Sequence, residues 1–467
     1  MKRLADVLGD VTVQTIVGDP DAAEVSGVVH DSRAVTAGAL FCCVRGATVD
    51  GHDLAPQARD AGAAALLCER VLPVDLPQVV VASTRQAMGP VSAAFWDHPS
   101  RALDVVGVTG TNGKTTTVHL LGSILEAADR QAAIIGTLTG SRTTPEAPEL
   151  QAALAGLRDD GVAAVAMEVS SHALAMHRVD GTWFRVAVFT NLSRDHLDYH
   201  RDMDSYFEAK AGLFTPDRCA SAVVNIDDPW GRRLAGELEV PWEPVSLGLV
   251  EETQIGLLSS RCRWEGVELR VPLGGRFNLA NALAAAVAAR TMGVAPATIA
   301  AGLAAASPVP GRFEPVDAGQ PFTVLVDYAH TPDGLEQVLR EARDVAAGHR
   351  VLLVFGCGGD RDATKRGPMG EVASRLADQA VLTSDNPRSE DPGAIIEAVL
   401  SGVSDRSRII VEPDRRAAIG AALDLAGDGD VVVIAGKGHE TTQTTGDRVE
   451  PFDDRVVARE ALVRRGW

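Results

Sequence analysis

The residues best suited to chemistry lie in one glycine-rich run, Gly107-Val-Thr-Gly-Thr-Asn-Gly-Lys-Thr-Thr-Thr117. Gly110 and Gly113 let the backbone turn tightly and point its N–H groups at phosphate oxygens. Lys114 can reach terminal phosphates, and the hydroxyl of Thr115 can hold Mg²⁺. The run therefore predicts a phosphate-binding loop. The alternative is a glycine turn that caps an ordinary strand–helix unit.

The segments around this run have the periodicity that a phosphate loop needs. Asp104–Val108 is apolar and strand-like, and Val118–Glu126 has helical spacing. Val108 stands where the common form of the loop has its first glycine, which indicates a particular subfamily. The residues expected to bind a nucleotide here are Gly110, Thr111, Asn112, Gly113, Lys114, Thr115 and Thr116.

Two polar segments follow apolar strands later in the same region. Glu168 ends the strand 163–168, and His196 lies in the loop 191–198 after the strand 186–190. Ligands gather at the strand ends of open α/β sheets, and a carboxylate with an imidazole suits a divalent cation. By itself His196 would be a hydrogen-bonded loop histidine. Its position after the phosphate loop favours a shared nucleotide and metal site.

Four apolar strands near the C-terminus each end in a charged loop. The loops are 326–333, 355–362, 385–388 and 435–440, with Lys365 and Arg366 following the second. A single charged loop is commonly a polar connection between elements. Four at one edge of a parallel sheet favour a substrate-binding edge.

The composition excludes several classes of protein. The 467 residues carry a formal charge of −19, which disfavours general attraction to nucleic acid or to anionic lipid. The six cysteines show no Cys-x-x-Cys pairing, so we expect free thiols rather than a zinc ribbon or a disulfide framework. The start lacks an uninterrupted apolar leader, and no run approaches the ~18 apolar residues of a membrane helix. We therefore expect a cytoplasmic protein that binds neither nucleic acid nor membrane.

The chain is long enough for about three domains, at ~150 residues each. Short strands alternate with helices over 1–98, which predicts a small α/β domain. A second α/β unit over 99–311 contains the phosphate loop, and its continuously apolar strands predict a parallel sheet covered on both faces. Ser307-Pro-Val-Pro-Gly-Arg312 breaks the pattern like a hinge. The remaining residues, 312–467, predict a Rossmann-like, doubly wound parallel sheet.

Five motifs follow one another along the chain: Thr109-Gly-Thr-Asn-Gly-Lys-Thr-Thr116, Met167-Glu-Val-Ser-Ser-His172, Thr190-Asn-Leu-Ser-Arg-Asp-His196, Asp327-Tyr-Ala-His-Thr-Pro332 and Gly436-Lys-Gly-His-Glu440. Together they resemble the Mur ligases, and the resemblance covers all three expected domains. The resemblance is to the branch that adds the third amino acid to UDP-N-acetylmuramoyl-L-alanyl-D-glutamate in peptidoglycan synthesis. Asp385-Asn-Pro-Arg388 is similar to the motif of enzymes that use meso-2,6-diaminopimelate.

The resemblance implies roles for individual residues. Two segments, Asp31-Ser-Arg33 and Arg45–Gly51, match those that hold the uridine nucleotide in the family. Ser32, within the first segment, would contact the diphosphate or the uridine. Asn281 and Arg312 would contact the ATP nucleotide. Residues implied for the muramoyl-dipeptide are Thr143, Thr144, Ser170 and Arg178; those implied for the incoming amino acid are Arg361, Asp385, Asn386, Pro387, Arg388, Gly436 and Glu440. Some relatives have a glutamine in place of Met176, so the substrate hydrogen bond that the glutamine would make is not implied for this chain.

The catalytic set implied by the resemblance is Lys114, Glu168, His196, Lys210 and His330, with Thr115, Glu168, His196 and Lys210 around Mg²⁺. By spacing alone Lys210 would be a surface lysine on an amphipathic helix. The family carries the matching lysine as a carbamate formed from CO₂, which turns a repelling ammonium into an oxygen ligand. ATP would phosphorylate the D-glutamyl carboxylate, and an amine of diaminopimelate would then displace phosphate. His330 would approach the phosphates as the last domain closes, and we expect a monomer.

Diaminopimelate differs from lysine by a second carboxylate at its far end. A guanidinium can hold that carboxylate with paired charge-assisted hydrogen bonds, and Arg388 is the candidate. Three alternatives remain at this point. They are a folylpolyglutamate synthetase, a lysine-adding ligase of the same branch, and a nucleotide-hydrolysing switch that joins no substrates.

Overall fold

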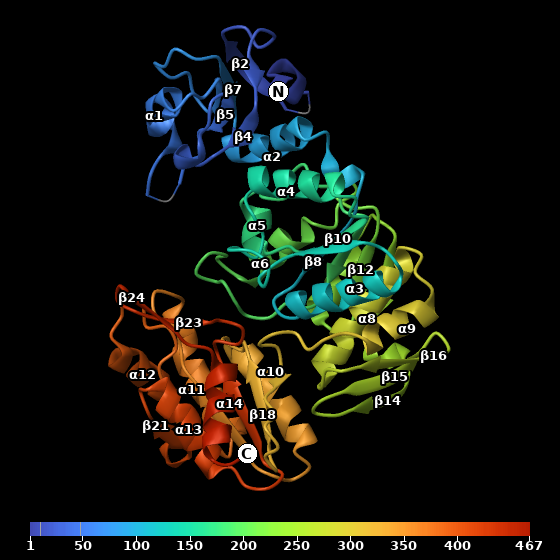
Figure 1. The fold of residues 1–467 in the computed structure, drawn as a ribbon, viewed down its shortest axis with the longest axis vertical. Coiled ribbons are helices and arrows are strands. Elements are labelled where there is room, and N and C mark those ends of the chain that lie inside the picture. Colours follow the sequence, from blue (N-terminus) through green and yellow to red (C-terminus); the bar gives the residue numbers. More distant parts are fainter. Residues whose placement is uncertain (10, 47) are drawn as a thin grey trace.

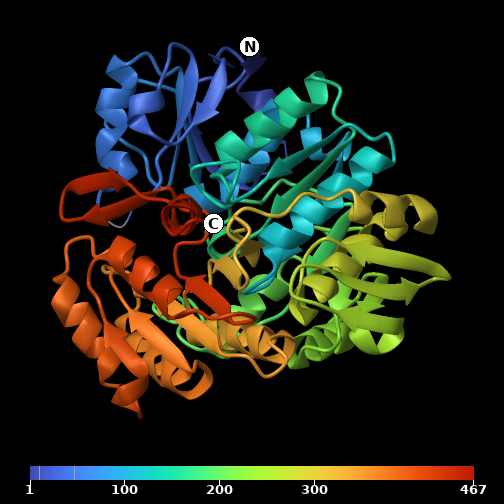
Figure 2. The same ribbon diagram turned by 60° about the horizontal axis from the view of Figure 1, so that its bottom comes forward.

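The computed structural model describes residues 1–9, 11–46 and 48–467. Asp10, and Ala47 within the predicted Arg45–Gly51 segment, lie outside the described residues. The chain forms three lobes that follow one another along the sequence, coloured blue, cyan to yellow, and orange to red in Figure 1. Turned by 60°, the lobes surround a common centre (Figure 2).

The N-terminal lobe contains a five-stranded sheet in the order β2-β7-β6-β5-β4. Its strands pair in parallel except for β2, which is antiparallel to β7 at the edge. The elements are β1 (Lys2–Arg3), β2 (Val13–Val17), β3 (Glu24–Val25), β4 (Gly27–Val29), β5 (Ala39–Cys42), α1 (Ala55–Asp60), β6 (Ala65–Cys68), β7 (Gln78–Val81) and α2 (Thr84–Phe95). Ser83 caps α2 by accepting a hydrogen bond from the N–H of Gln86, as N-cap serines do.

The central lobe contains a six-stranded, fully parallel sheet in the order β13-β12-β11-β8-β10-β9. Its strands are β8 (Asp104–Thr109), β9 (Ala132–Ile135), β10 (Ala164–Glu168), β11 (Val186–Phe189), β12 (Ala222–Asn225) and β13 (Trp242–Val245). Its helices are α3 (Lys114–Ala127), α4 (Ala147–Asp159), α5 (Ser171–Ala175), α6 (Met203–Ala211), α7 (Pro229–Glu237), α8 (Arg276–Thr291) and α9 (Pro296–Ala304). One core lies between the sheet and α3 with α8, and another lies on the α4 and α6 side. Covering both faces explains the nearly continuous apolar runs of the inner strands β8, β10 and β11, whereas the edge strand β13 is partly exposed.

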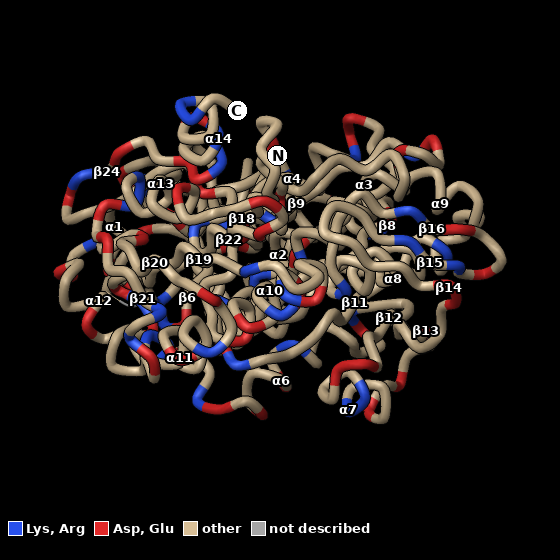
Figure 3. Tube along the Cα trace, turned by 90° about the horizontal axis from the view of Figure 1, so that it is seen from below, with Lys and Arg blue, Asp and Glu red and all other residues tan. Residues whose placement is uncertain are grey.

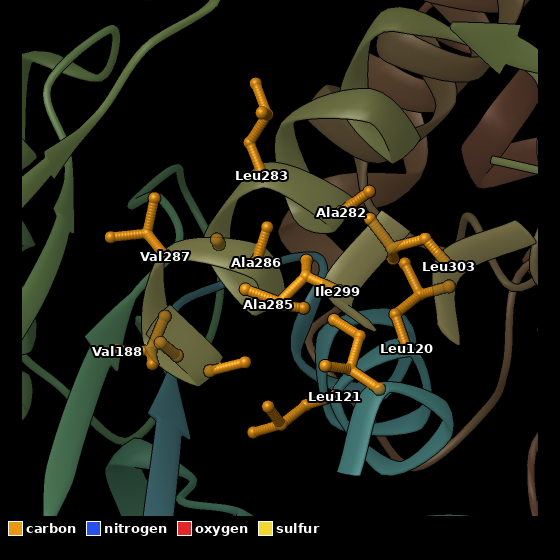
Figure 4. Close-up of a cluster of buried hydrophobic side chains, with 14 of the residues drawn as sticks. Leu120, Leu121, Val188, Ala282, Leu283, Ala285, Ala286, Val287, Ile299 and Leu303 are labelled. Carbon is orange, nitrogen blue, oxygen red and sulfur yellow. The ribbon is translucent and has the colours of Figure 1, made fainter. Parts of the chain in front are cut away.

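Small residues let three helices of this lobe pack closely. Leu120 and Leu121 of α3 lie against the alanine-rich face of α8 and against Ile299 and Leu303 of α9 (Figure 4). A Cβ on Gly302 of α9 would lie 2.5 Å from the Cα of Ile124, so only glycine allows this approach. The packing fixes α8, which carries one of the expected nucleotide contacts.

A small antiparallel sheet extends the central lobe in a region whose sequence contains few functional motifs. It comprises β14 (Glu251–Ile255), β15 (Ser260–Trp264) and β16 (Val267–Val271). Burial alternates along β15, with Cys262 and Trp264 inward and Arg261 and Arg263 outward. This period of two gives a half-buried strand that adds to the core beside α9.

The C-terminal lobe has a six-stranded sheet in the order β17-β18-β22-β19-β20-β21. The strands are β17 (Glu314–Pro315), β18 (Thr323–Asp327), β19 (Val351–Phe355), β20 (Gln379–Leu382), β21 (Ile409–Val411) and β22 (Val431–Ala435), and a hairpin adds β23 (Thr442–Thr445) and β24 (Arg448–Pro451). Helices α10 (Pro332–Val345), α11 (Arg366–Leu376) and α12 (Pro392–Leu400) cover one face, and α13 (Arg415–Leu425) and α14 (Asp454–Arg464) cover the other.

The fold class expected from the sequence is confirmed: three α/β lobes with parallel central and C-terminal sheets. One detail differs, because the edge strand β17 is antiparallel to β18. The register pairs Asp327 with Ala435 and Phe355 with Leu382, so the four charged loops do emerge at one edge. Figure 3 shows charges of both signs interspersed along the chain. All six cysteines are free and buried.

No helix in the described part of the chain combines the length and apolar character needed to cross a membrane.

Candidate active site

The phosphate loop connects the end of β8 to the start of α3. Gly110 and Gly113 have φ values of +149° and +87°, which side chains with a Cβ rarely adopt. A Cβ on Gly113 would collide with the carboxamide of Asn281. The predicted nucleotide contact on α8 therefore lies directly against the loop.

A second loop holds the first one in shape. The N–H of Thr111 donates to the carbonyl of Asn191 at 2.9 Å, and the N–H of Asn112 donates to the Asn191 side chain at 2.9 Å. Lys114 Nζ donates to the carbonyls of Gly110 and Thr111, each at 2.8 Å. Burial lowers the pKa of Lys114, because removing the ammonium from water costs free energy. A bound anionic phosphate would offset that cost.

Glu168 faces the start of α3 from the end of β10. Its carboxylate accepts hydrogen bonds from the Thr115 hydroxyl at 3.0 Å, the Thr137 N–H at 2.8 Å and the Thr137 hydroxyl at 3.2 Å. Mg²⁺ prefers oxygen ligands, and it is bound through one or two carboxylates plus substrate phosphates rather than by an all-protein cage. The adjacent oxygens of Thr115 and Glu168 fit that requirement. Correspondingly, no group of three or more His, Cys, Asp or Glu side chains with a metal-binding arrangement occurs within 1–9, 11–46 and 48–467.

His196 and Lys210 approach the loop from its other side. His196 has a left-handed backbone, with φ of +54°, and its Nε2 lies 3.3 Å from the Asp195 carboxylate. Burial lowers the pKa of His196 to about 4, which leaves the imidazole neutral at pH 7. Lys210 is buried on α6, and its Nζ donates to the carbonyl of Gly110 at 2.8 Å. Burial, followed by the nearby Lys114, holds the pKa of Lys210 well below its usual value.

The C-terminal lobe supplies the opposite wall of the site. Arg312 Nη2 donates to the Thr115 hydroxyl at 3.2 Å, and its guanidinium lies 4.5 Å from the centre of the Tyr328 ring. Nδ1 of His330 lies 2.8 Å from the Tyr328 carbonyl, and because that oxygen can only accept, Nδ1 carries the proton. Burial is the main cause that lowers the pKa of His330 to about 4.

These walls enclose a cavity of about 240 Å³, lined from the central lobe by Lys114, Thr115, Glu168 and His196 and from the C-terminal lobe by Arg312, Asp327 and His330. A second cavity of about 330 Å³ shares Asn112, Gly113, Phe277, Asn281 and Gln337 with the first. The two adjoining volumes give one elongated site between the lobes.

The residues expected to contact the muramoyl-dipeptide form one hydrogen-bonded group beside Glu168. The Thr144 hydroxyl donates to the Glu168 carbonyl at 2.9 Å and accepts from the Ser170 N–H at 3.1 Å. Arg178 Nη1 donates to the Thr144 carbonyl at 3.2 Å, and the hydroxyls of Thr137 and Thr143 lie 3.0 Å apart. Ser32 lies apart from this group, in the short helix Ser32–Ala34 of the N-terminal lobe. Met176 contributes its sulfur as an acceptor for Arg178 Nη2 at 3.4 Å.

The residues expected at the amino-acid end also meet, at the edge of the C-terminal sheet. The Asn386 amide donates to the Glu440 carboxylate at 2.7 Å, and Arg388 Nη1 donates to the Gly359 carbonyl at 2.6 Å. A Cβ on Gly436 would lie 2.7 Å from the buried Asp385 carboxylate, whose pKa is raised by burial. Arg361 is exposed on the neighbouring loop.

Comparison with known proteins matches three successive parts of the chain to one family. The matches are "Mur ligase family, catalytic domain" over residues 24–96, "Mur ligase middle domain" over 108–289 and "Mur ligase, glutamate ligase domain" over 311–438. A Streptomyces coelicolor relative, UDP-N-acetylmuramoyl-L-alanyl-D-glutamate–2,6-diaminopimelate ligase, is 47% identical over 99% of this chain and 96% of its own length. The chain belongs to the Mur ligase family.

Other relatives agree with this assignment. A ligase of the same name from Geobacillus thermodenitrificans is 46% identical over 96% of both chains. A solved structure of such a ligase is 32% identical, covers 100% of both chains and has a TM-score of 0.70. Mycobacterium tuberculosis folylpolyglutamate synthase, 18% identical with a TM-score of 0.60 over 80% of this chain and 93% of its own, shares the fold alone.

Some residues in this Mur ligase site were not singled out from the sequence. Lys437 is fully buried, and its Nζ lies 3.2 Å from both the Asn386 side chain and the Glu440 carboxylate. It lies inside the Gly436-Lys-Gly-His-Glu440 motif, so the motif itself was an available signal. Thr137 donates two hydrogen bonds to Glu168. It follows β9 and lies in no recognisable motif, so its contact with Glu168 is evident only from the fold.

Proposed function

We propose that this Mur ligase joins meso-2,6-diaminopimelate to the D-glutamyl carboxylate of UDP-N-acetylmuramoyl-L-alanyl-D-glutamate, in peptidoglycan precursor synthesis. It is an ATP-dependent, ADP-forming ligase, and its substrates are small molecules. The observation that carries the proposal is the single cavity with Lys114, Thr115 and Glu168 on one wall and Arg312 and His330 on the other. The wall from the central lobe can bind ATP next to the carboxylate that is phosphorylated, and the C-terminal lobe can bind the amino acid whose amine attacks.

The chemistry follows from the low reactivity of a carboxylate. An oxygen of the D-glutamyl carboxylate attacks the γ-phosphorus of ATP, and the bond from that phosphorus to ADP breaks, giving an acyl phosphate. The neutral amine then attacks the acyl carbon, phosphate leaves with the electron pair of the broken C–O bond, and the amine loses a proton. Lys114 and Arg312 stabilise the charge that builds between the two anions. Closing the site between the lobes excludes water from the acyl phosphate.

Mg²⁺ would be held by Thr115 and Glu168, and it would supply further neutralisation of phosphate charge. His330, neutral at pH 7, keeps its Nε2 free to accept a proton. The nucleotide would lie along the phosphate loop toward Asn281. The muramoyl-dipeptide would lie along Thr143, Thr144, Ser170 and Arg178, with its uridine end at Ser32.

A carbamate on Lys210 is part of this proposal. Lys210 is buried beside the phosphate loop, where an ammonium would repel Mg²⁺. The neutral amine would attack the carbon of CO₂ and release one proton, which gives an anionic carbamate. The carbamate oxygen and His196 would then hold a second Mg²⁺. Bicarbonate labelled with ¹³C should give a carbamate NMR signal in the wild-type enzyme and none in Lys210→Arg.

The lobes divide the work among them. We assign residues 1–98 to the uridine nucleotide, 99–311 to ATP and 312–467 to the amino acid, held by Arg361, Asp385, Asn386, Pro387, Arg388, Gly436 and Glu440. We further infer a monomer in the cytoplasm, where ATP is available and free thiols such as the buried cysteines stay reduced. Light scattering on the purified enzyme measures the oligomeric state.

The decisive experiment offers the enzyme ATP, the UDP-linked dipeptide carrying isotope-labelled carboxylate oxygen, and a panel of amino acids. We expect ADP release only when both other substrates are present, a product with the mass of the diaminopimelate adduct, and label in the liberated phosphate. ADP release indifferent to both substrates would instead indicate a nucleotide-hydrolysing switch. Product without label in phosphate would reject the acyl phosphate.

A further inference from the structure

A buried carboxylate between the N-terminal and central lobes is surrounded by arginines. Glu146 lies just before α4, and its side chain is only 5% exposed. Arg178 Nη2 lies 2.9 Å from one carboxylate oxygen, Arg85 Nη1 lies 3.2 Å from the other, and Arg142 Nη1 lies 3.7 Å from the first. Three guanidinium groups face one carboxylate, so the cluster keeps net positive charge.

The three arginines come from separate parts of the fold. Arg85 belongs to α2 of the N-terminal lobe, whereas Arg142 and Arg178 belong to loops of the central lobe. Arg85 also approaches the Met176 carbonyl at 3.5 Å. Glu146 therefore ties the lobe assigned to the uridine nucleotide to the loop that carries Arg178.

Arg178 is tied on its other side to the reaction centre. Its Nη1 donates to the Thr144 carbonyl, and the Thr144 hydroxyl donates to the carbonyl of Glu168. The buried Nε of Arg178 has no hydrogen-bond partner among the described residues. A mostly buried guanidinium, with a side chain 15% exposed and a donor without a partner, is suited to an anionic ligand.

The substrate offers one such anion, if the proposed function holds. D-Glutamate has two carboxylates, and only one of them is phosphorylated and joined to the amine. The other stays charged through the whole reaction and must be held in place without reacting. Because Arg178 lies one hydrogen bond from Thr144, which itself contacts the backbone of Glu168, it can hold that second carboxylate while the first reaches the phosphate.

We propose that Glu146 is a positioning residue for dipeptide recognition: it orients Arg178 toward the unreactive carboxylate of the D-glutamyl group and links that arginine to Arg85 of the N-terminal lobe. Glu146 itself touches no substrate. Removing its charge frees Arg178 to take other rotamers, so affinity for the dipeptide falls while the ATP and amino-acid sites keep their geometry. The inference rests on the proposed function and deepens it.

The test compares wild type with Glu146→Gln on two acceptors: the normal UDP-linked dipeptide and an analogue whose unreactive carboxylate is an amide. In wild type the amide should raise the acceptor KM strongly, because Arg178 loses its anionic partner. In Glu146→Gln we expect the KM for the normal acceptor to rise by about tenfold, the size of one weakened charge-assisted contact, with the KM values for ATP and diaminopimelate within about twofold. The penalty for the amide should shrink by a similar factor.

Controls separate this role from simple stability. Glu237→Gln removes an exposed Glu–Arg pair, 3.0 Å from Arg233, and should leave every KM unchanged. Glu146→Asp keeps the charge but shortens the side chain, so we expect an intermediate acceptor KM. If Glu146→Gln does not fold, Glu146→Asp decides the question by the same two-acceptor comparison.

The outcomes are distinct. An unchanged acceptor KM and an unchanged amide penalty in a folded variant would overturn the inference. Equal rises in all three KM values would do the same, because they would indicate general loosening of the fold. Failure of wild type to form the diaminopimelate product would count against the proposed function instead.

Discussion

Arg388 is held in an unusual backbone conformation, with φ of +53°. Its N–H donates to the Thr444 carbonyl at 3.0 Å and its carbonyl accepts from the Gly446 N–H at 2.6 Å, so hairpin β23–β24 fixes it. Nη1 donates to the Gly359 carbonyl, and the other guanidinium N–H groups have no hydrogen-bond partner among the described residues, which leaves them for a ligand. A left-handed backbone conformation costs free energy in a residue with a side chain, and such conformations cluster at functional sites. The conformation of Arg388 therefore favours a role in ligand binding over that of an ordinary surface arginine.

Arg388→Ala should therefore lose most of the preference for diaminopimelate over lysine. Without the arginine, the far carboxylate of diaminopimelate has no paired hydrogen bonds, and we expect discrimination to fall about a hundredfold, roughly 3 kcal/mol. The ratio of kcat/KM for the two amino acids, from phosphate release, measures this. Arg388→Lys is the matched control, with a charge but no planar fork. Equal discrimination by Arg388→Ala and wild type would refute the role.

Lys210→Ala tests the carbamate through activity. On the proposal that Lys210 carries a carbamate, the variant loses an anionic oxygen donor beside the phosphate loop, so we expect kcat to fall by at least about a hundredfold. Small carboxylates or bicarbonate should restore part of the rate, because they can occupy the space of the missing side chain. Steady-state kinetics with and without acetate measure the rescue. Normal activity in the variant would discard the carbamate.

Helix α8 starts without a side-chain cap of its own. Gly275 has no side chain, and the N–H of Arg276 instead donates at 2.8 Å to Glu341 of α10, in the C-terminal lobe. An acidic group at a helix N-terminus stabilises the orphan N–H groups and the helix dipole. The cap thus holds α8, with Asn281, against the C-terminal lobe.

Glu341→Leu should remove this cap. We expect a loss of about 1–2 kcal/mol in the free energy of unfolding of the region. We also expect a raised KM for ATP, because Asn281 lies about one and a half turns from the start of α8. Urea denaturation and ATP kinetics measure the two effects. Glu341→Gln keeps an acceptor oxygen, and burial already raises the pKa of Glu341, so this variant should stay close to wild type. Equal losses in both variants would show that the charge, not the acceptor, matters.

The sequence predicted the buried strands well because their apolar runs are continuous. The expected strand 186–190 is β11 (Val186–Phe189), and 322–327 is β18 (Thr323–Asp327). β14–β16 lack such runs, since arginines alternate with buried residues along β15, and the hairpin β23–β24 is mostly polar and exposed. The alternation along β15 spans only five residues and is a weaker signal than a continuous apolar run, and the hairpin has no apolar periodicity that distinguishes it from a loop.

Site residues divide in the same way. Lys114, Glu168 and His330 follow strands within recognisable motifs, so their approach to one cavity could be expected from parallel-sheet geometry. Glu146 and Glu341 act across lobes, and no local pattern distinguishes them from surface glutamates. Their partners are fixed only by how the lobes pack.

Two partly buried histidines make the stability of the protein depend on pH. Burial lowers the pKa of both His330 and His439 to about 4, against about 6.5 in an unfolded chain. Between pH 6.5 and 4 the unfolded state therefore binds more protons than the folded state. The free energy of unfolding then rises with pH and falls on acidification across this window.

His439→Gln isolates one of these groups, because its ring packs 5.0 Å from Tyr328 and its Nδ1 has no hydrogen-bond partner among the described residues. At pH 5 the wild-type histidine should cost about 1 kcal/mol relative to pH 7, because its partial exposure to solvent weakens the effect of the shift, and the glutamine variant should lack that cost. Urea unfolding at pH 5 and pH 7 measures the change in the free energy of unfolding for each protein. The contributions of the buried carboxyl groups are the same in both proteins and cancel in the difference. If the free energy of unfolding changes with pH in the same way in variant and wild type, His439 is already accessible to protons in the folded enzyme. Acid would then destabilise the protein through other groups.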